Sequence, residues 1–541
     1  MEPGAMSVPE SDDVAEITAV ARRWLAAEPD ADLRAELEAL IDGPPDELMA
    51  VFSGRLQFGT AGLRAPIGPG PMGMNRLVVR QAAAGFARYL LDTDPSAADR
   101  GVIIAFDARR KSDVFATDTA RVLAAHSIRA IVFAEPMPTP VLAWSITEVG
   151  AAGGVVVTAS HNPPADNGYK VYLADGAQIV APIDTEISDR IGASDPLAIE
   201  LADADSELII VADPGLVESY VHAAAGVRLC RDVPPVRVAY TAMHGVGGAI
   251  TERAFAAAGL SEPVAVAEQH EPDGTFPTVS FPNPEEPGAM DLVIEAAWRA
   301  GASIALAHDP DADRLGVAVI GNDGTARRLG GDEIGWLFAD HVLRHTEGDD
   351  RLVISSMVSS SLLGRMAEAA GVDHAEVFTG FKWIAREIAE RSDRRFVFGY
   401  EQALGYLVTD RPRDKDGISA AVMMAEIAAE AAADGTDLEG RLDEIAARFG
   451  RYRIAEISVR MDPDDARAAV ARLLADPPDE LDGRRVIEVS EFVEAKLLRL
   501  LTDGGVRVQV RPSGTEPKVK LYGEAIDADP TPALEALAAL L

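Results

Sequence analysis

The chain has 541 residues, of which 48% are hydrophobic and 25% charged, a composition typical of soluble globular proteins with about three or four domains. Its formal net charge of −37 argues against nucleic acid and anionic membranes as partners, and its single cysteine, Cys230, excludes an intrachain disulfide and a cysteine-based zinc cluster. No apolar run is long enough to span a membrane and the N-terminal residues are too acidic for a signal peptide, so we expect a cytoplasmic protein.

Segments typical of strands and helices alternate along most of the chain. Residues 1–45 have the apolar spacing of surface helices. Beyond them, short apolar strands alternate with helices, which predicts three successive α/β units with parallel strands. The predicted strands are 101–107, 128–133, 154–159, 236–240, 304–307, 352–355, 375–378 and 395–399, and the predicted helices are 114–127, 141–149, 249–258, 289–300 and 418–433.

The pattern changes after Gly450. A strand at 453–459, a helix at 464–474, further short strands and a last helix predict a smaller α+β domain. The expected organisation is a helical extension at 1–45, three α/β domains at 46–213, 214–324 and 325–449, and a C-terminal α+β domain at 450–541.

The stretch at 153–164, G-G-V-V-V-T-A-S-H-N-P-P, ends a buried strand in small polar residues. Ser160 would lie at the carboxyl end of that strand, where open α/β sheets place their chemistry. With His161 beside it as a proton acceptor and Lys170 following as a cation, Ser160 is a candidate nucleophile. An ordinary turn after a strand is the alternative for this stretch alone.

Two glycine-rich stretches precede the first predicted strand. They are F-G-T-A-G-L-R at 58–64 and G-P-G-P-M-G-M-N at 68–75. So much glycine indicates sharp turns or a close approach of the backbone to another group. Arg64 on such a loop could reach a phosphate, and a surface loop is the alternative.

Three aspartates, Asp309, Asp311 and Asp313, follow the strand predicted at 304–307. In an extended segment alternate side chains point the same way, so the three carboxylates should converge and suit a magnesium ion. A calcium EF-hand is rejected because Arg314 and Ile320 stand where that loop needs Gly and Glu. An aspartyl-phosphate enzyme and an acidic surface turn stay open.

Two further candidates follow predicted strands in the third unit. Lys382 lies near the start of a helix, whose positive end would favour an anion. Glu401 could accept hydrogen bonds from sugar hydroxyls. The chain has few lysines, and Lys415 is among those near the motifs, so we predict that it also contacts substrate. Plain loops are the alternative for Lys382 and Glu401.

The last motif is R-P-S-G-T-E-P-K at 511–518, a turn between apolar strands. A guanidinium, two hydroxyls and glycine-freed backbone amides suit a phosphate dianion. The candidates are Arg511, Ser513, Gly514 and Thr515. A simple turn is the alternative.

Together these motifs resemble the α-D-phosphohexomutase superfamily, the serine-dependent phosphoglucomutases and phosphomannomutases, over roughly residues 55–525. T-A-S-H-N-P, D-P-D-A-D-R and R-P-S-G-T-E-P carry the resemblance, which implies four domains around a central cleft. It also implies a phosphoserine at Ser160, which would hold Mg²⁺ together with Asp309, Asp311 and Asp313. The residues expected around the transferring phosphoryl group are Arg64, His161 and Lys170. Those expected to contact the sugar are Arg314 and Glu401, and those expected to hold the non-reacting phosphate are Arg511, Ser513, Gly514 and Thr515.

The implied activity is the interconversion of glucose or mannose 1- and 6-phosphates, with a sugar bisphosphate as intermediate and activator. Ala403 stands where many members have serine, and G-Y-E-Q-A-L-G-Y at 399–406 looks more like the phosphopentomutase and bacterial α-phosphoglucomutase branch. A phosphopentomutase is therefore one alternative. Two alternatives of other classes are a metal-dependent sugar-phosphate phosphatase and a catalytically idle sugar-phosphate binding protein. The expected partner is a small phosphosugar, and the expected state is a monomer or homodimer.

Overall fold

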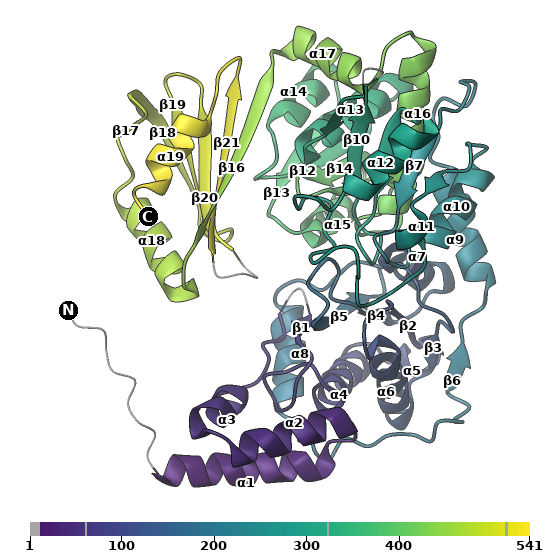
Figure 1. Cartoon of the computed structure of the whole chain (residues 1–541), viewed down its shortest axis with the longest axis vertical. Coiled ribbons are helices and arrows are strands. Elements are labelled where there is room, and N and C mark those ends of the chain that lie inside the picture. The colour runs from purple at the N-terminus through teal and green to yellow at the C-terminus, as the bar shows by residue number, and fades with distance from the viewer. Residues whose placement is uncertain (1–10, 60–61, 322–323, 514–517) are drawn as a thin grey trace.

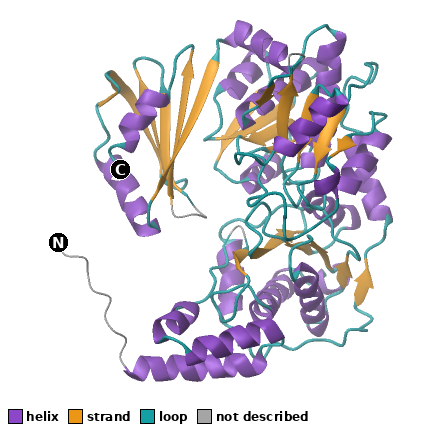
Figure 2. Cartoon of the chain, in the orientation of Figure 1, coloured by secondary structure: helices purple, strands orange, loops and turns teal. Residues whose placement is uncertain are grey.

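Four sheets in chain order organise the protein. The computed structural model describes residues 11–59, 62–321, 324–513 and 518–541. Each sheet belongs to one successive part of the chain, and the first three have helices on both faces (Figures 1 and 2). The predicted fold class, three similar mixed α/β domains followed by a smaller C-terminal α+β domain, is confirmed.

From residue 11 onward, three helices precede the first sheet: α1 (Ser11–Ala27), α2 (Ala31–Asp42) and α3 (Pro45–Phe52). Trp24, Leu37 and Leu48 from these helices belong to the hydrophobic core of the first unit. Lys111 of that unit forms ion pairs with Asp30 at 2.9 Å. The N-terminal helices are therefore packed onto the first unit as part of its core.

The first sheet has the strand order β1-β5-β4-β2-β3-β6. Its strands are β1 (Leu63–Pro66), β2 (Val102–Phe106), β3 (Ala130–Val132), β4 (Gly153–Val157), β5 (Asp166–Leu173) and β6 (Ile209–Val211), and its helices are α4 (Arg76–Thr93), α5 (Ala97–Arg100), α6 (Ser112–Ala125), α7 (Thr139–Val149) and α8 (Ile183–Gly192). Alternate residues of β2 enter cores on opposite faces, so the strand is buried on both sides. Helix α4 was missed: its N-cap, Asn75, whose side chain accepts from Val78 N, lies in the glycine-rich stretch that we interpreted as a loop.

The second sheet has the order β11-β10-β9-β7-β8 and the third the order β13-β12-β14-β15. The second unit has β7 (Val238–Thr241), β8 (Val264–Ala265), β9 (Ile304–Ala307), β10 (Gly316–Ile320) and β11 (Ala326–Arg328), with α9 (Gly215–Ala225), α10 (Gly248–Ala257), α11 (Ala267–His270) and α12 (Asp291–Ala300). The third has β12 (Arg351–Ser356), β13 (Asp373–Val377), β14 (Arg395–Glu401) and β15 (Gly405–Leu407), with α13 (Gly331–His345), α14 (Leu362–Ala369), α15 (Phe381–Glu390), α16 (Gly417–Ala433) and α17 (Leu438–Phe449).

The same local arrangement recurs in these three units. In each, a buried strand that is parallel to its other neighbour is followed by a loop and an antiparallel strand: β4 to β5, β9 to β10, and β14 to β15. The three intervening loops contain Ser160, Asp309 and Gln402. Three predicted motifs therefore occupy equivalent positions at the carboxyl ends of buried strands.

The fourth sheet is antiparallel, with the order β16-β21-β20-β19-β18-β17. Its elements are β16 (Tyr452–Arg460), α18 (Pro463–Ala475), β17 (Glu480–Leu481), β18 (Arg484–Phe492), β19 (Leu497–Thr502), β20 (Arg507–Pro512), β21 (Lys518–Ile526) and α19 (Thr531–Ala538). Residues of both helices, Val470 and Leu534 among them, share a core with one face of this sheet.

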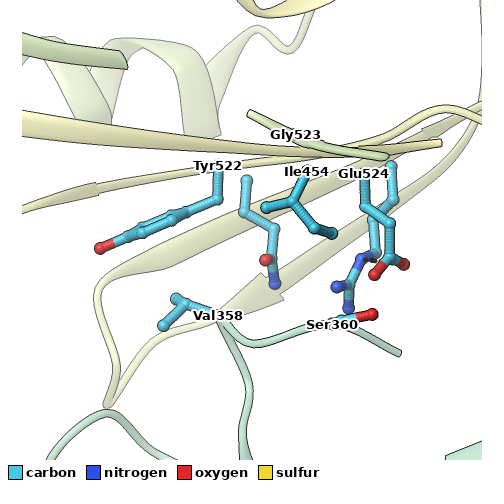
Figure 3. Close-up of a pocket in the computed structure, with 8 residues that line it drawn as sticks. Val358, Ser360, Ile454, Tyr522, Gly523 and Glu524 are labelled. Atoms are coloured by element: carbon cyan, nitrogen blue, oxygen red, sulfur yellow. Dashed lines mark ion pairs between the residues drawn. The ribbon is translucent and has the colours of Figure 1, made fainter. Parts of the chain in front are cut away.

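The fourth unit contacts the third through hydrogen bonds and through an apolar cluster that includes Val358 and Tyr522. Gln509 Nε2 donates to Met357 O at 2.6 Å, and Ser361 N donates to a Glu524 oxygen at 2.9 Å. Figure 3 shows the crevice between the two units, with Val358 and Ser360 facing Tyr522 and Glu524. Its free volume of about 10 Å³ leaves room for about one water molecule. None of the helices in the described part of the chain is long and apolar enough to cross a membrane.

Asp332 at the start of α13 gives a prediction about stability and pH. Its buried carboxylate accepts hydrogen bonds from Ser360 N and the Tyr400 hydroxyl, both at 2.7 Å. Burial raises the pKa of Asp332 from 3.8 to about 6. The folded chain therefore binds this proton more tightly than the unfolded chain, and the stability it contributes is lost as pH rises from about 4 to about 6.

Asp332→Asn imitates the protonated carboxyl and keeps an oxygen for both donors. We expect its free energy of unfolding, relative to wild type, to rise by about 3 kcal/mol between pH 4 and pH 7. Urea unfolding of both proteins across this range measures the difference. A difference that does not change with pH would contradict the assignment.

Candidate active site

Ser160 lies just beyond β4 and faces the aspartate loop of the second unit. Its backbone is left-handed, with φ of 54°, and its N–H donates to Thr158 Oγ1 at 2.8 Å. Its hydroxyl donates to Asp309 Oδ2 at 3.0 Å and lies 3.2 Å from His161 Nδ1. The structure thus brings together the serine, the histidine and the first aspartate that the sequence singled out.

The three aspartates after β9 converge, but the reason we gave from the sequence is wrong. The segment is a tight turn rather than an extended strand: Ala312 has φ of 55° and its N–H donates to Asp309 O at 2.9 Å. The turn leaves one oxygen of each of Asp309, Asp311 and Asp313 within 4.8 Å of the others. All three side chains are buried.

Lysines from two other units approach the aspartates. Lys170 Nζ lies 2.6 Å from Asp311 Oδ2 and 3.1 Å from Asp313 Oδ2, and Lys415 Nζ lies 3.2 Å from Asp313 Oδ2. Thr139 Oγ1 donates to Asp311 Oδ2 at 2.7 Å. The opposite oxygens of Asp311 and Asp313 are buried and have no hydrogen-bond partner among the described residues. Buried oxygens without a donor are what a hard cation such as Mg²⁺ requires, so the residues fit a magnesium ion.

The charges of the site influence one another strongly. Burial and the two neighbouring carboxylates raise the pKa of Asp309 well above its usual range. Burial would also raise the pKa of Asp311 and Asp313, but the Lys170 ammonium lowers both below the usual value. Burial and nearby guanidinium groups hold the pKa of His161 well below its usual range. The mutual repulsion of the carboxylates favours a bound cation.

Arg64 lies in strand β1 rather than in the loop that we predicted. β1 pairs antiparallel with β5, with Arg64 opposite Gly168. This pairing places the guanidinium beside the serine loop, where Nη1 donates to Asn162 Oδ1 at 3.0 Å. Arg64 therefore lies near Ser160, as expected, although on a more rigid element.

Arg314 connects the aspartate loop with the loop between β14 and β15. Its N–H donates to Asp309 Oδ1 at 3.1 Å, and its Nη1 donates to Ala403 O at 3.0 Å. An isolated bridge joins Arg314 to Gly405. The second and third units are therefore joined directly at the site.

The predicted sugar-contacting residues lie together in the third unit. Helix α15 begins at Phe381, so Lys382 is near its N-terminus as predicted, and burial lowers its pKa to about 8. Glu401 Oε1 accepts from Gly380 N at 2.6 Å. Lys415 Nζ also lies 3.1 Å from Asp414 Oδ1. Glu401 therefore lies against the start of α15, and Lys415 connects the third unit with the aspartate loop through Asp313.

Sequence reasoning missed the residues that hold Lys415. Asp414 is buried and accepts hydrogen bonds from Tyr172 at 2.7 Å and Gln178 at 2.9 Å, both from the first unit. Thr139, which contacts Asp311, was also missed. A single threonine or aspartate outside a motif gives no signal, although Asp414 precedes a lysine that the sequence did single out.

The last motif lies on the β20–β21 hairpin of the fourth unit. Arg511 is in β20, its guanidinium 3.4 Å from the Tyr522 hydroxyl, and Ser513 N donates to Lys518 O at 2.8 Å. Gly514 and Thr515 lie outside the described residues. Among the described residues, no hydrogen bond joins Arg511 to the Ser160 loop, although Figure 1 shows this end of the hairpin turned toward the first unit. The structure thus brings three of the four motifs into contact.

Comparison with known proteins identifies the family that has this arrangement of domains. Family models described as phosphoglucomutase/phosphomannomutase alpha/beta/alpha domains I, II and III match residues 55–197, 218–322 and 330–449, and the model of the C-terminal domain matches 456–539. The fold and site are those of an isomerase that transfers a phosphoryl group within a sugar phosphate. The chain belongs to the phosphoglucomutase/phosphomannomutase family.

Full-length relatives share about a third of the sequence. The chain is 39% identical over 481 residues to the Haemophilus influenzae protein named "Probable phosphomannomutase" (86% of this chain, 96% of that protein) and 33% identical over 542 residues to the phosphopentomutase of Homo sapiens (91% and 88%). It is 32% identical over 495 residues to a phosphoglucomutase of Staphylococcus epidermidis (86% and 90%). The crystal structure of a phosphoglucomutase/phosphomannomutase family protein from Burkholderia thailandensis shares the fold, with a TM-score of 0.71 at 23% identity over 90% of this chain and 96% of that chain.

Proposed function

We propose that this chain is a phosphosugar mutase that interconverts the 1- and 6-phosphates of glucose, mannose or both through phospho-Ser160 and a bisphosphorylated sugar. The observation that carries the proposal is the contact between the Ser160 hydroxyl and Asp309 at 3.0 Å. It places a nucleophile of the first unit against a buried carboxylate cluster of the second. Family membership and the names of the relatives support the same class of reaction.

The carboxylate cluster is suited to hold the magnesium ion that we expect as cofactor. Asp309, Asp311 and Asp313, with an oxygen on Ser160, would be its ligands. When bound, the ion supplies positive charge that offsets charge developing on the transferring phosphoryl group. Lys170, beside Asp311 and Asp313, and Arg64, beside the serine loop, would add cationic charge. His161 lies close enough to exchange a proton with the reacting oxygen.

The reaction then proceeds in two transfers. The P–O bond of phospho-Ser160 breaks as the free hydroxyl of the sugar monophosphate forms a new P–O bond and gives up its proton, which yields a sugar bisphosphate and free Ser160. The bisphosphate then reorients in the site, and the Ser160 oxygen takes the other phosphoryl group as the P–O bond between that group and the sugar breaks. The proton lost by Ser160 ends on the sugar oxygen that is released. A sugar bisphosphate is therefore expected to act as an activator as well as the intermediate.

The remaining residues would recognise the sugar and its non-reacting phosphate. Glu401 and Arg314 would contact sugar hydroxyls, with Lys382 and Lys415 beside them. Arg511, Ser513, Gly514 and Thr515 would hold the phosphate from the fourth unit.

The phosphopentomutase reaction, from 1- to 5-phosphate, is the second candidate. A relative named phosphopentomutase matches over 91% of this chain, and Ala403 follows the predicted sugar-contacting glutamate. Coupled assays with the 1-phosphates of glucose, mannose, ribose and deoxyribose decide between the two. A higher kcat/KM for a hexose phosphate supports the first candidate, and a higher value for a pentose phosphate replaces it with the second. The cytoplasmic location, the monomeric or dimeric state and the domain boundaries stay predictions.

Arg511→Ala tests whether the fourth unit holds the non-reacting phosphate. We expect kcat/KM for the monophosphates to fall by an amount equivalent to about 2 kcal/mol or more, mainly through a higher KM, because a charged hydrogen bond to the phosphate is lost. Inorganic phosphate released per turnover should rise, because remote binding energy would no longer exclude water from phospho-Ser160.

Arg511→Lys is the matched variant, and it should recover only part of the loss because an ammonium cannot reproduce a planar two-pronged contact. Steady-state kinetics together with a phosphate-release assay measure both effects. A wild-type KM in both variants would mean that the phosphate is held elsewhere.

A further inference from the structure

The guanidinium of Arg109 contacts the backbone of the serine loop, residues 158–165. Arg109 follows β2, and its side chain is completely buried. Nη2 donates to Ser160 O and to Asn162 O, both at 2.6 Å. Nη1 donates to Pro163 O at 2.8 Å and to Asp166 O at 3.2 Å. One side chain therefore binds four backbone carbonyls of the segment that carries the nucleophile.

Outside these four contacts, isolated hydrogen bonds hold the backbone of the serine loop, such as Asn162 N to Ala159 O and Ile67 N to Ala165 O. Residues 158–165 are neither helix nor strand, so their carbonyl groups lack the partners that regular structure provides. Ser160 is also held in the left-handed region, with φ of 54°, which costs a residue with a side chain about 1–2 kcal/mol. The four hydrogen bonds from one rigid, planar group can hold this conformation, and no other side chain offers donors in that geometry.

Arg109 is itself held from two sides. Its Nε lies 3.3 Å from Asp107 Oδ2, a carboxylate that also accepts from Ser112 Oγ at 2.7 Å. On one face the ring of Phe276, from the second unit, lies 4.8 Å from the guanidinium carbon. Gly274 brings this loop so close that an added Cβ would lie 2.3 Å from Ala108 O. The first and second units thus meet at the guanidinium as well as at the Ser160–Asp309 contact.

We propose that Arg109 is a positioning residue, which holds Ser160 in the orientation that aims its oxygen at the aspartate loop, and that Phe276 fixes Arg109 across the boundary between the two units. The inference rests on the proposed role of Ser160 as nucleophile. Arg109 touches only the backbone of the serine loop and the groups that hold it in place. Its loss should therefore impair phosphoryl transfer with little change in the binding of sugar phosphate.

Arg109→Ala and Arg109→Lys test this inference. We expect kcat to fall about 100-fold in both, the effect of a displacement of about 1 Å at the reacting atoms, while KM stays close to wild type. Added guanidinium ion should partly restore kcat of Arg109→Ala, because the small cation can occupy the vacated space and donate to the same carbonyls. A purely structural role would not give a rescue of kcat.

Arg351 offers a matched control in the third unit. It is also buried, and its guanidinium donates to backbone carbonyls, with Nε to Gly348 O at 2.9 Å and Nη1 to Thr346 O at 2.6 Å. It begins β12, the opposite end of that strand from the site. Arg351→Ala should lower the midpoint of thermal unfolding and leave kcat near wild type, with no rescue by guanidinium ion.

Phe276→Leu tests the same inference if the Arg109 variants do not fold. It keeps an apolar side chain but removes the ring, so we expect kcat to fall about 30-fold, the worth of a desolvated cation–π contact, at an unchanged KM. Ser160→Ala is measured in the same assay. If it is inactive while the Arg109 and Phe276 variants match Arg351→Ala in kcat, the positioning role is wrong. If Ser160→Ala keeps wild-type activity, the proposed function itself fails.

Discussion

Ser160→Ala is expected to lower kcat by at least about 10⁴-fold, because the variant has no oxygen to carry the phosphoryl group between the two transfers. The residues proposed to hold the sugar and its phosphate are unchanged. The variant should therefore still bind glucose 1-phosphate, with an affinity close to that of the wild type. Coupled mutase assays measure the first effect, and isothermal titration calorimetry measures the second.

Ser145→Ala is a matched control for this change. Ser145 is a buried serine of the same unit, and its hydroxyl donates to Val141 O at 2.7 Å within helix α7. Its replacement removes the same atom and a hydrogen bond without reaching the site, so kcat should stay near wild type. Mutase activity in Ser160→Ala equal to that of Ser145→Ala would exclude Ser160 as the nucleophile.

Asp311→Asn should lower kcat by about 100-fold or more with little change in side-chain volume. The change removes one of the three charges proposed to hold the magnesium ion. It also removes the countercharge that lies 2.6 Å from Lys170. Sugar-phosphate binding should be retained, so the loss should appear in kcat more than in KM.

Asp118→Asn separates this effect from the general cost of altering a buried aspartate. Asp118 is fully buried and forms ion pairs with Arg76 at 2.7 Å and Arg80 at 2.9 Å, within the first unit and away from the aspartate loop. Its replacement should reduce stability and leave kcat near wild type.

Treatment of the wild-type enzyme with a chelator should abolish turnover until Mg²⁺ is added back. Full activity in excess chelator would show that the metal assignment is wrong.

Much of the fold could be predicted because its strands are strongly apolar. β2, β4, β9 and β12 were all expected close to their observed bounds. The antiparallel strands β5, β10 and β15 were not predicted, because each follows a motif loop closely and has a glycine at or near its start, which weakens the signal of a strand. These strands create the arrangement that recurs in three units, in which a motif loop joins a strand with a parallel neighbour to an antiparallel strand. This arrangement is visible only in the folded structure.

The site was predictable where its residues are clustered in sequence and unpredictable where they act alone. Ser160 and the aspartates lie in short motifs in which several polar or charged residues stand close together, and a purely structural role seldom accounts for such a cluster. Arg109, Thr139 and Asp414 are single residues whose partners lie far along the chain, so only the fold reveals them. The turn at Ala312 was also missed, because a left-handed backbone at alanine leaves no mark in the sequence.

The central claim is that Ser160 carries the phosphoryl group, and phosphopeptide mapping of the active enzyme tests it most directly. Intact mass should show one added phosphate, and mapping should place it on the peptide that contains Ser160. A phosphoserine is expected to survive acid and hydroxylamine. Hydroxylamine-labile phosphate on Asp309 or Asp311 instead would contradict the account and identify an aspartyl-phosphate enzyme.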